Sequence, residues 1–424
     1  MKIISFPNVN EWTQLCLRPE TSFQDSRSLV QNIFSAVGQK GDAALTQYTK
    51  EFDGVTLKNL AFKVPSAEIK INAALKNAIT QAKKNIEKFH RSQVETIKKI
   101  NTAPGITCWR ESRAIEKVGL YIPGGSAPLF STLLMLAIPA RIAGCKEIII
   151  CTPPQKNGRP HPVIIYTAQL LGIERIFTLG GMQAIAALTL GTESVPKVDK
   201  IFGPGNQYVM AAKQEAQQYV AVDMPAGPSE VLVIADDTAV PEFIAADLLA
   251  QAEHGPDSQV ILLTTKKRIA DAVSKQLKAQ LAALPRQTIA EAAIENSKII
   301  VLKNLEDCFS FSNQYAPEHL IIAVKNASDW LSSVQNAGSV FMGNYACESV
   351  GDYASGTNHT LPTNGFAKSY SGVSVDSFVK KITFQTISKK GLENIGNTVE
   401  VMAAAEGLQA HKNAVSIRLK NKVQ

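Results

Sequence analysis

Short apolar runs alternate with helical segments over most of the chain from Val118 onward. The runs are bounded by Gly, Pro, Asn or Asp, and apolar residues recur at helical spacing between them. Strands that alternate with helices indicate βαβ units and a mainly parallel sheet. The predicted strands are VGLYIP, EIIICTPP, RIFTLGG and DKIFGPG, followed by EVLVIAD, QVILLTT, KIIVLKN, HLIIAVKN and GSVFMGN.

These runs form two sets that are joined near residues 224–229, so the fold class is α/β with two Rossmann-like halves. Residues 24–100 are polar and helical in pattern, which predicts surface helices. From about Val375 the pattern turns helical again, and this tail could be a separate unit or an arm that packs on a partner chain.

Composition narrows the class of protein. A chain of 424 residues with 45% hydrophobic content can bury a large core. The net charge of +7 is spread along the chain without a basic block, so nucleic-acid binding is not expected. The N-terminus lacks a signal-peptide pattern, and no run approaches the ~18 apolar residues of a membrane span, which predicts a cytoplasmic protein. The six cysteines form no Cys-x-x-Cys pair and are expected to be reduced, mostly buried thiols.

The stretch AQAEHGPDSQV places Gln251 and His254 one turn apart at the end of a helix that begins at Pro241. The two side chains share a face, and the partial negative charge of a helix C-terminus favours a cation there. Two interpretations remain open at this point: the pair binds a metal ion, or His254 caps the last carbonyl groups of the helix.

The stretch YAPEHLIIAV places Glu318 and His319 directly after Pro317 and before an apolar strand. Adjacent residues of a regular strand face opposite ways, so a site that uses both requires an irregular turn, which Pro317 favours. Such a pair suits general acid/base chemistry near neutral pH, although it could equally be a polar strand entry.

Further possible ligands lie in ESVGDYASGTNHTLPT, with Asp352 and His359 in a predicted Gly-rich loop, and in AEGLQAHKNAV, with Glu406 and His411. An Asp in such a loop often caps a turn, and Glu406 and His411 could lie on a solvated helix face.

Two Gly-rich stretches, YIPGGSAPLFST and FGPGNQYVMAAK, each lie between a strand and a helix. Their backbone N–H groups could approach a pyrophosphate at a helix N-terminus. Neither contains the full dinucleotide fingerprint, so each is a weak signal alone.

Several of these strings occur in order along the chain and together resemble the histidinol dehydrogenase family. The resemblance implies two Rossmann-like, aldehyde-dehydrogenase-like α/β domains with parallel sheets and a small helical C-terminal region. It implies the NAD-dependent, zinc-dependent four-electron oxidation of L-histidinol to L-histidine through L-histidinaldehyde, the last steps of histidine biosynthesis. It further implies one Zn2+ per subunit and a homodimer with shared active sites. The strings are VGLYIPGGSAPLFSTLLMLAIPARIAGC, VDKIFGPGNQYV, VDMPAGPSEVLVIAD, LAQAEHGPDSQ, YAPEHL, GDYASGTNHTLPT and SGVSVDSF.

The resemblance also implies roles for individual residues and a division into domains. Glu318 and His319 would be the catalytic acid/base pair. The metal ligands would be Gln251, His254, Asp352 and His411, with His411 reaching the partner's site. Those four, together with Ser229, His319 and Glu406, would bind substrate, and Tyr121, Gln183 and Asn206 would bind the dinucleotide. The expected domains are residues 1–20 with 121–229 (dinucleotide side), residues 21–120 with 230–374 (metal and acid/base side), and the helical arm 375–424.

Other functions are compatible with parts of the pattern. Cys145 or Cys151 could form a thioester in an aldehyde-dehydrogenase-like route. A zinc hydrolase could use Glu318 on a metal-bound water, and a metal-binding module would catalyse nothing. One departure from the family pattern, Cys347 where proline is expected, affects the local loop shape.

Overall fold

The computed structural model describes residues 1–19, 24–124, 127–225 and 227–420. The chain divides into two compact units. The larger unit contains Met1–Gln93 and Ile115–Phe378, and the smaller contains Val94–Ala114 with the segment from Val379 onward. Two six-stranded sheets lie in the larger unit and one three-stranded sheet in the smaller.

The first sheet has the strand order β2-β7-β6-β5-β8-β9 and is parallel except for β2, which pairs antiparallel with β7. Its strands are β2 (Ala61–Lys63), β5 (Lys117–Tyr121), β6 (Glu147–Cys151), β7 (Arg175–Phe177), β8 (Lys200–Phe202) and β9 (Ala221–Val222). Its helices are α2 (Gln24–Lys40), α3 (Asp42–Asp53), α4 (Ala73–Arg91), α5 (Phe130–Ala143), α6 (Pro162–Leu170), α7 (Gly181–Leu190) and α8 (Gln207–Ala216).

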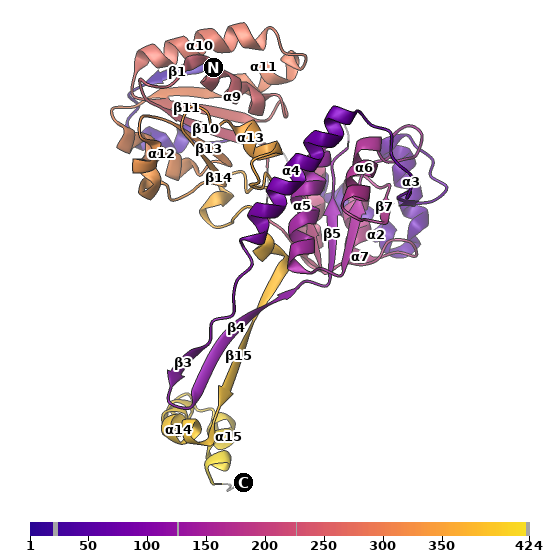
Figure 1. Ribbon diagram of the computed structural model, residues 1–424, viewed down its shortest axis with the longest axis vertical. Helices are drawn as coiled ribbons and strands as arrows, with labels where there is room; N and C mark the ends of the chain where they lie inside the picture. Colours follow the sequence, from indigo (N-terminus) through magenta and orange to yellow (C-terminus); the bar gives the residue numbers. More distant parts are fainter. Residues whose placement is uncertain (20–23, 125–126, 226, 421–424) are drawn as a thin grey trace. The chain divides into compact units, whose positions relative to one another are not determined.

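Helices cover both faces of this sheet, as Figure 1 shows. One apolar cluster joins the sheet to α2, α3, α7 and α8, and a second joins it to α4, α5 and α6. Residues 131–140 of α5 are all buried, which explains why this stretch is apolar on every side.

The second sheet has the order β1-β12-β11-β10-β13-β14, and all its strands are parallel. Helices α9, α10 and α11 contribute to the apolar cluster on one face, and α1 and α12 to that on the other. The strands are β1 (Lys2–Ser5), β10 (Glu230–Ala235), β11 (Gln259–Thr264), β12 (Lys298–Val301), β13 (His319–Ala323) and β14 (Ser339–Met342). The helices are α1 (Trp12–Leu15), α9 (Pro241–Ala252), α10 (Lys267–Leu281), α11 (Gln287–Glu295), α12 (Leu305–Tyr315) and α13 (Glu348–Tyr353).

The predicted α/β class with parallel sheets is therefore confirmed, but the expected assignment of the N-terminal segments is wrong. Strand β1 pairs with β12 in the second sheet, so residues 1–20 do not belong with 121–229. Strand β2 pairs with β7 in the first sheet, and α2 packs on α7 and α8, so residues 24–93 do not belong with 230–374. The apolar faces of these segments fit either sheet by periodicity alone, and the edge pairing decides between them.

The smaller unit contains the antiparallel strands β3 (Ile100–Ala103), β4 (Ile106–Ala114) and β15 (Val379–Ile387), in the order β15-β4-β3, and the helices α14 (Lys389–Ala405) and α15 (Gln409–Lys420). The expectation of a wholly helical tail from Val375 is wrong, because β15 pairs with β4 over its whole length. Phe384 lies opposite Trp109 with stacked rings, a cross-strand contact that favours the pairing. The two helices pack on each other at Gly396, where a Cβ atom would lie 2.7 Å from Leu419.

Within the parts of the chain that the structure describes, each helix is too short or too polar to cross a membrane.

Candidate active site

The predicted Gln251 lies near the C-terminal end of helix α9, and His254 lies just after that helix. The helix begins at Pro241 as predicted and ends at Ala252, so His254 follows it by two residues. The His254 N–H donates to the carbonyl oxygen of Gln251 at 3.2 Å. The Gln251 side chain is buried, whereas His254 is exposed.

The predicted acid/base pair lies where β13 begins. Ala316, which caps the C-terminal end of α12, has φ of +55°, an uncommon value for a non-glycine residue, so the chain turns irregularly just before Glu318. Nδ1 of His319 lies 3.6 Å from Oε2 of Glu318, and both residues are buried. The irregular turn expected from Pro317 is therefore confirmed.

The main chain of Glu230, the first residue of β10, holds both members of this pair. Its N–H donates to Oε2 of Glu318 at 2.9 Å, and its carbonyl oxygen lies 3.1 Å from Nδ1 of His319. Because a carbonyl oxygen only accepts, Nδ1 carries a proton in this contact, and Nε2 is the nitrogen that can take up or release one. Nε2 of Gln251 also donates to Oε2 of Glu318, at 3.2 Å.

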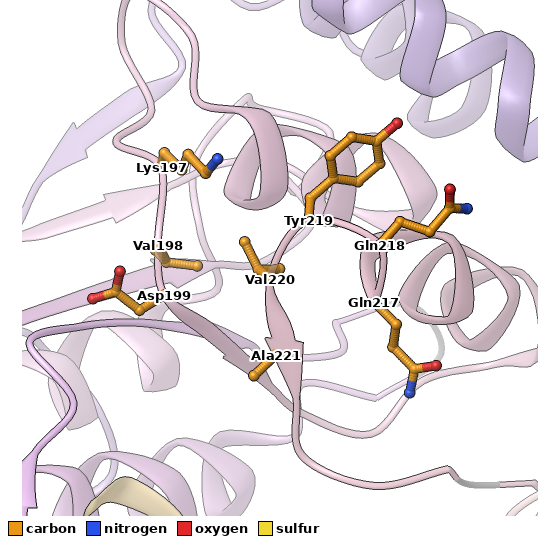
Figure 2. A pocket seen from close by; sticks show the side chains of 8 residues that line it. All are labelled: Lys197, Val198, Asp199, Gln217, Gln218, Tyr219, Val220 and Ala221. Atoms are coloured by element: carbon orange, nitrogen blue, oxygen red, sulfur yellow. The ribbon is translucent and has the colours of Figure 1, made fainter. Parts of the chain in front are cut away.

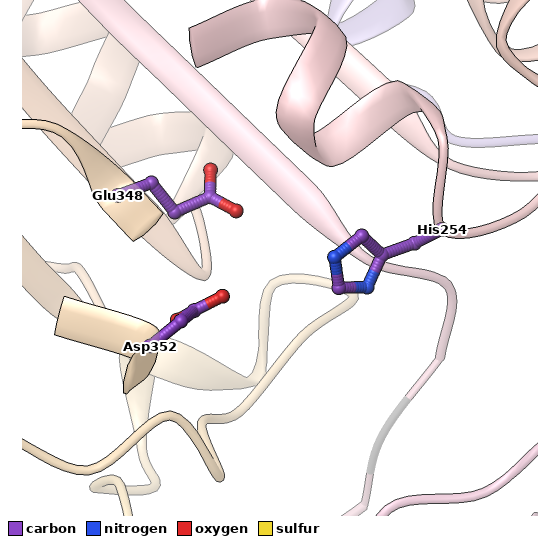
Figure 3. A group of neighbouring side chains, drawn as sticks. All are labelled: His254, Glu348 and Asp352. Atoms are coloured by element: carbon purple, nitrogen blue, oxygen red, sulfur yellow. The ribbon is translucent and has the colours of Figure 1, made fainter. Parts of the chain in front are cut away.

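Helix α13 contributes Glu348 and Asp352, which lie one turn apart. The segment at Asp352, expected to be a loop, forms this short helix instead. Position 351 in the helix favours glycine, because a Cβ atom there would lie 2.5 Å from the Phe341 ring. The side chains of Glu348, Asp352 and His254 are grouped in Figure 3, each offering a ligand atom within 4.8 Å of the others. Two of these three residues are the predicted ligands His254 and Asp352.

Negative charge dominates the cluster. Burial opposes the charged form of His319, but the charges of Glu348 and Glu318 and the contact with Asp352 raise its pKa well above the usual value. Burial raises the pKa of Glu348 well above its usual value. Burial also acts against ionisation of Asp352, yet the contact with His319, whose Nε2 lies 3.4 Å from Oδ1, lowers the Asp352 pKa. The cluster therefore favours a positive charge, on His319 or on a bound cation.

Three buried atoms of the cluster make no hydrogen bond with the described residues: Oε1 of Gln251, Oε2 of Glu348, and Nε2 of His319, which has only its ion-pair contact with Asp352. Buried polar atoms are nearly always paired, so three such atoms in one place indicate that a ligand completes the cluster. Amide oxygen, imidazole nitrogen and carboxylate oxygen are all donors that a cation accepts. The residues present therefore fit a metal ion with a polar substrate beside it.

The cluster lies at the amino ends of β10 and β13 and at the C-terminal end of α9, the helix that connects the parallel strands β10 and β11. Ligands of open parallel sheets usually bind at the carboxyl ends, so this placement departs from the general rule. Ser229, a predicted substrate contact, precedes Glu230 at the same edge, where its carbonyl oxygen accepts from the N–H of Gln259 at 3.1 Å.

The predicted dinucleotide residues follow the carboxyl ends of β5, β7 and β8 in the first sheet. Tyr121 is the last residue of β5, and its hydroxyl accepts from the N–H of Gly181 at 3.2 Å. Gln183, in the first turn of α7, donates to Asp53 at 3.4 Å, and its Oε1 is buried without a partner among the described residues. Asn206 caps α8 by accepting two backbone N–H groups at 3.1 Å. This arrangement fits a polar ligand at the carboxyl edge.

The Gly-rich loop after β8 requires glycine at Gly203, where φ is +133° and a Cβ would lie 2.2 Å from the carbonyl oxygen of Tyr121. A buried ion pair between Lys213 and Asp223 holds this loop. Lys213 donates to the Gly203 carbonyl oxygen at 3.0 Å, and Asp223 accepts from the Gly203 N–H at 2.8 Å. In the other Gly-rich stretch, Gly125 and Ser126 lie outside the described residues.

Glu406 and His411 belong to the smaller unit, where Glu406 ends α14 and His411 lies in the first turn of α15. Both side chains are exposed.

Sequence reasoning did not identify Glu348. The sequence feature that could have identified Glu348 is its spacing of four residues from Asp352. This spacing places both side chains on one face if the segment is helical. Gly351 and Gly356 favoured a loop instead.

A surface depression at the amino ends of β8 and β9 is separate from these residues, and none of the predicted site residues lines it. Figure 2 shows its lining side chains, which are Lys197, Val198, Asp199, Gln217, Gln218, Tyr219, Val220 and Ala221.

Two mainly parallel α/β sheets, one of which carries the predicted acid/base pair beside possible metal ligands, place the protein in the class of α/β enzymes. A family model described as histidinol dehydrogenase matches residues 16–419. The chain belongs to the histidinol dehydrogenase family, a family of oxidoreductases, and the predicted resemblance is confirmed.

Individual relatives agree over nearly the whole chain. The histidinol dehydrogenase of Bacteroides thetaiotaomicron is 55% identical over 423 residues, covering 99% of each chain. That of Xanthomonas euvesicatoria pv. vesicatoria is 49% identical over 427 residues, again covering 99% of each. A crystal structure of histidinol dehydrogenase from Elizabethkingia anophelis has 56% identity and a TM-score of 0.96, and the match covers 99% of this chain and 98% of that one.

Proposed function

We propose that this chain oxidises L-histidinol to L-histidine through L-histidinaldehyde, with NAD as the electron acceptor and one zinc ion per subunit. The observation that supports this most directly is the buried Glu318–His319 pair within the same cluster as His254 and Asp352. An alcohol oxidation needs a base at the hydroxyl group, and the His319 imidazole can take that role once a bound cation balances the carboxylates that otherwise raise its pKa.

His319 and Glu318 divide the proton transfers between them. In the first oxidation, Nε2 of His319 would take the hydroxyl proton as hydride leaves the carbinol carbon. In the second, water adds to the aldehyde carbon, a proton passes to Glu318, and hydride leaves the resulting hydrate. Both donors to Glu318 bind Oε2, and we assign Oε1 to the attacking water.

The proposed metal ligands are Gln251, His254 and Asp352, with His411 of the partner subunit. Zinc, when bound, orients the imidazole and amino nitrogens of the substrate. The unpartnered Oε1 of buried Gln251 supports the assignment of an amide ligand. Ser229 and His319 would contact substrate from the same chain, and Glu406 from the partner, within a homodimer that has shared sites.

NAD, when bound, accepts one hydride in each oxidation. Tyr121, Gln183 and Asn206 would hold it at the carboxyl edge of the first sheet. The hydroxyl of Tyr121 stays neutral, because burial raises its pKa to about 12. The proposed location is the cytoplasm, where the six free cysteines would stay reduced.

Purified protein given zinc, NAD and histidinol should form about two NADH per histidinol consumed, because conversion of an alcohol to an acid releases two hydrides. Absorbance of NADH and chromatography of histidine measure the two products. A zinc hydrolase or a metal-binding module would form no NADH, and that result would reject the proposal.

A variant without Cys145 and Cys151 serves as the control in this assay and should keep the wild-type rate. Burial raises the pKa of the Cys145 thiol to about 11 and that of Cys151 still further, so neither is a ready thiolate. Alanine is preferred at both positions, because a serine hydroxyl at Cys151 would lie among apolar side chains. Loss of activity together with a trapped thioester in the wild type would instead support the aldehyde-dehydrogenase-like route.

Gln251→Ala and His254→Ala should each lower zinc affinity by at least about tenfold, since each would remove one proposed ligand. Zinc content after dialysis against a buffered zinc concentration measures the change without reference to activity. His161→Asn is the matched control: His161 caps α6 through Nδ1, asparagine can take over the cap, and zinc content should not change. Wild-type zinc content in both variants would rule out the proposed ligands.

A further inference from the structure

Arg18 reaches the candidate active site indirectly, through Glu230. Its guanidinium group donates to both carboxylate oxygens of Glu230, from Nε at 2.5 Å and from Nη2 at 3.0 Å. Nη2 also donates to the carbonyl oxygen of Tyr315 at 2.8 Å, and the guanidinium carbon lies 3.9 Å from the centre of the Tyr315 ring. These contacts hold Arg18 in one orientation, because the planar group is bound at its edge and on its face.

Glu230 connects this buried ion pair to both catalytic side chains. Its carboxylate is 2% exposed and also accepts from the N–H of Asn364 at 2.8 Å. On the main-chain side, the N–H of Glu230 binds Glu318, and its carbonyl oxygen binds Nδ1 of His319. A shift of this one residue would therefore move both proton-transfer groups.

Glu230 requires a cationic partner, because its carboxylate is buried near a second carboxylate, that of Glu318. The negative charge of Glu318 acts on Glu230 across the strands, and Arg18 is the cation that offsets it. A buried charge that loses its partner forces the surrounding structure to rearrange. Without Arg18, the start of β10 would have to move or admit water.

We propose that Arg18 is a positioning residue for histidinol oxidation: by holding Glu230 it fixes the two main-chain groups that aim Glu318 and His319. This rests on the proposed function. Arg18 itself does not touch the reacting atoms. A displacement of a catalytic group by about 1 Å can slow a reaction about 100-fold. Loss of this positioning role should therefore be measurable as a lower kcat.

Arg18→Met should lower kcat by about 10- to 100-fold, while zinc content and the KM for NAD stay at wild-type values. Arg18→Lys keeps the charge but cannot form both parallel bonds, so it should lose less activity and also serves if the methionine variant folds poorly. Arg268→Met is the control: it removes an exposed ion pair with Asp237, 3.7 Å long, and should leave kcat unchanged.

A double-mutant cycle with His319→Asn separates positioning from general stabilisation. If Arg18 acts through His319 and its neighbour, Arg18→Met should cost at most a few-fold in kcat when His319 is already replaced. If the Arg18–Glu230 ion pair contributed only to stability, Arg18→Met would lower the zinc content and the folded fraction. It would also lower kcat by the same factor in both backgrounds, and that result would overturn the proposal.

The outcomes also separate this inference from the proposed function. If wild-type protein forms no NADH from histidinol, both fail. If the wild type is active and Arg18→Met retains its full kcat, only the positioning role fails.

Discussion

The His319→Asn variant should turn over histidinol about 10²- to 10⁴-fold more slowly than the wild type, the usual contribution of a general base. Nδ1 of His319 is bound to the carbonyl oxygen of Glu230, which leaves Nε2 as the basic nitrogen. An asparagine amide can replace the Nδ1 hydrogen bond but offers no basic nitrogen. Steady-state kcat with histidinol and saturating NAD measures the loss.

The same substitution at His161 controls for the chemical change itself, since His161 lies on α6 outside the cluster. Its kcat should match that of the wild type. The His319→Asn protein should also bind zinc normally, because His319 is not a proposed ligand. A kcat within a few-fold of the wild type would show that another group takes the hydroxyl proton.

Mixing two inactive variants, His411→Asn and His319→Asn, should restore activity. Each homodimer would be nearly inactive, one because every site lacks a metal ligand and the other because every site lacks its base. If His411 enters the site of the partner subunit, a mixed dimer holds one site with both lesions and one with neither. After free exchange of equal amounts, about a quarter of all sites should be intact.

The experiment follows NADH formation with histidinol while the two purified variants exchange subunits. Mixing His319→Asn with Glu318→Gln is the matched control: both lesions lie at the start of β13, so every site of a mixed dimer keeps one of them. That mixture should stay inactive. If the first mixture also stays inactive while mass analysis confirms mixed dimers, His411 acts within its own chain.

Much of the fold could be predicted because its signals are local. Except for the two-residue β9, the strands from β5 to β14 were each visible as a short apolar run, and the start of α9 was visible at Pro241. The Glu318–His319 pair was also detectable, since Pro317 marked the irregular turn that brings the two side chains together.

Other features depended on pairings between segments that are distant in sequence. Strand β1 joins β12 nearly three hundred residues later, and β15 forms on β4, which supplies the hydrogen bonds that the tail alone lacks. Glu348 becomes part of the cluster only because α13 forms a helical turn where the glycines suggested a loop.

The sequence by itself determined the class of the fold, the family, and the identity of most candidate site residues, because strand and helix periodicity and the long motif strings are properties of contiguous residues. Tertiary structure alone decided which sheet each N-terminal segment completes and that the candidate acid/base cluster lies at the amino ends of β10 and β13. It also decided that Arg18 reaches Glu230, 212 residues away. The physical reason is that strand pairing and the burial of charge depend on which partner surface is available, and no local stretch contains that surface.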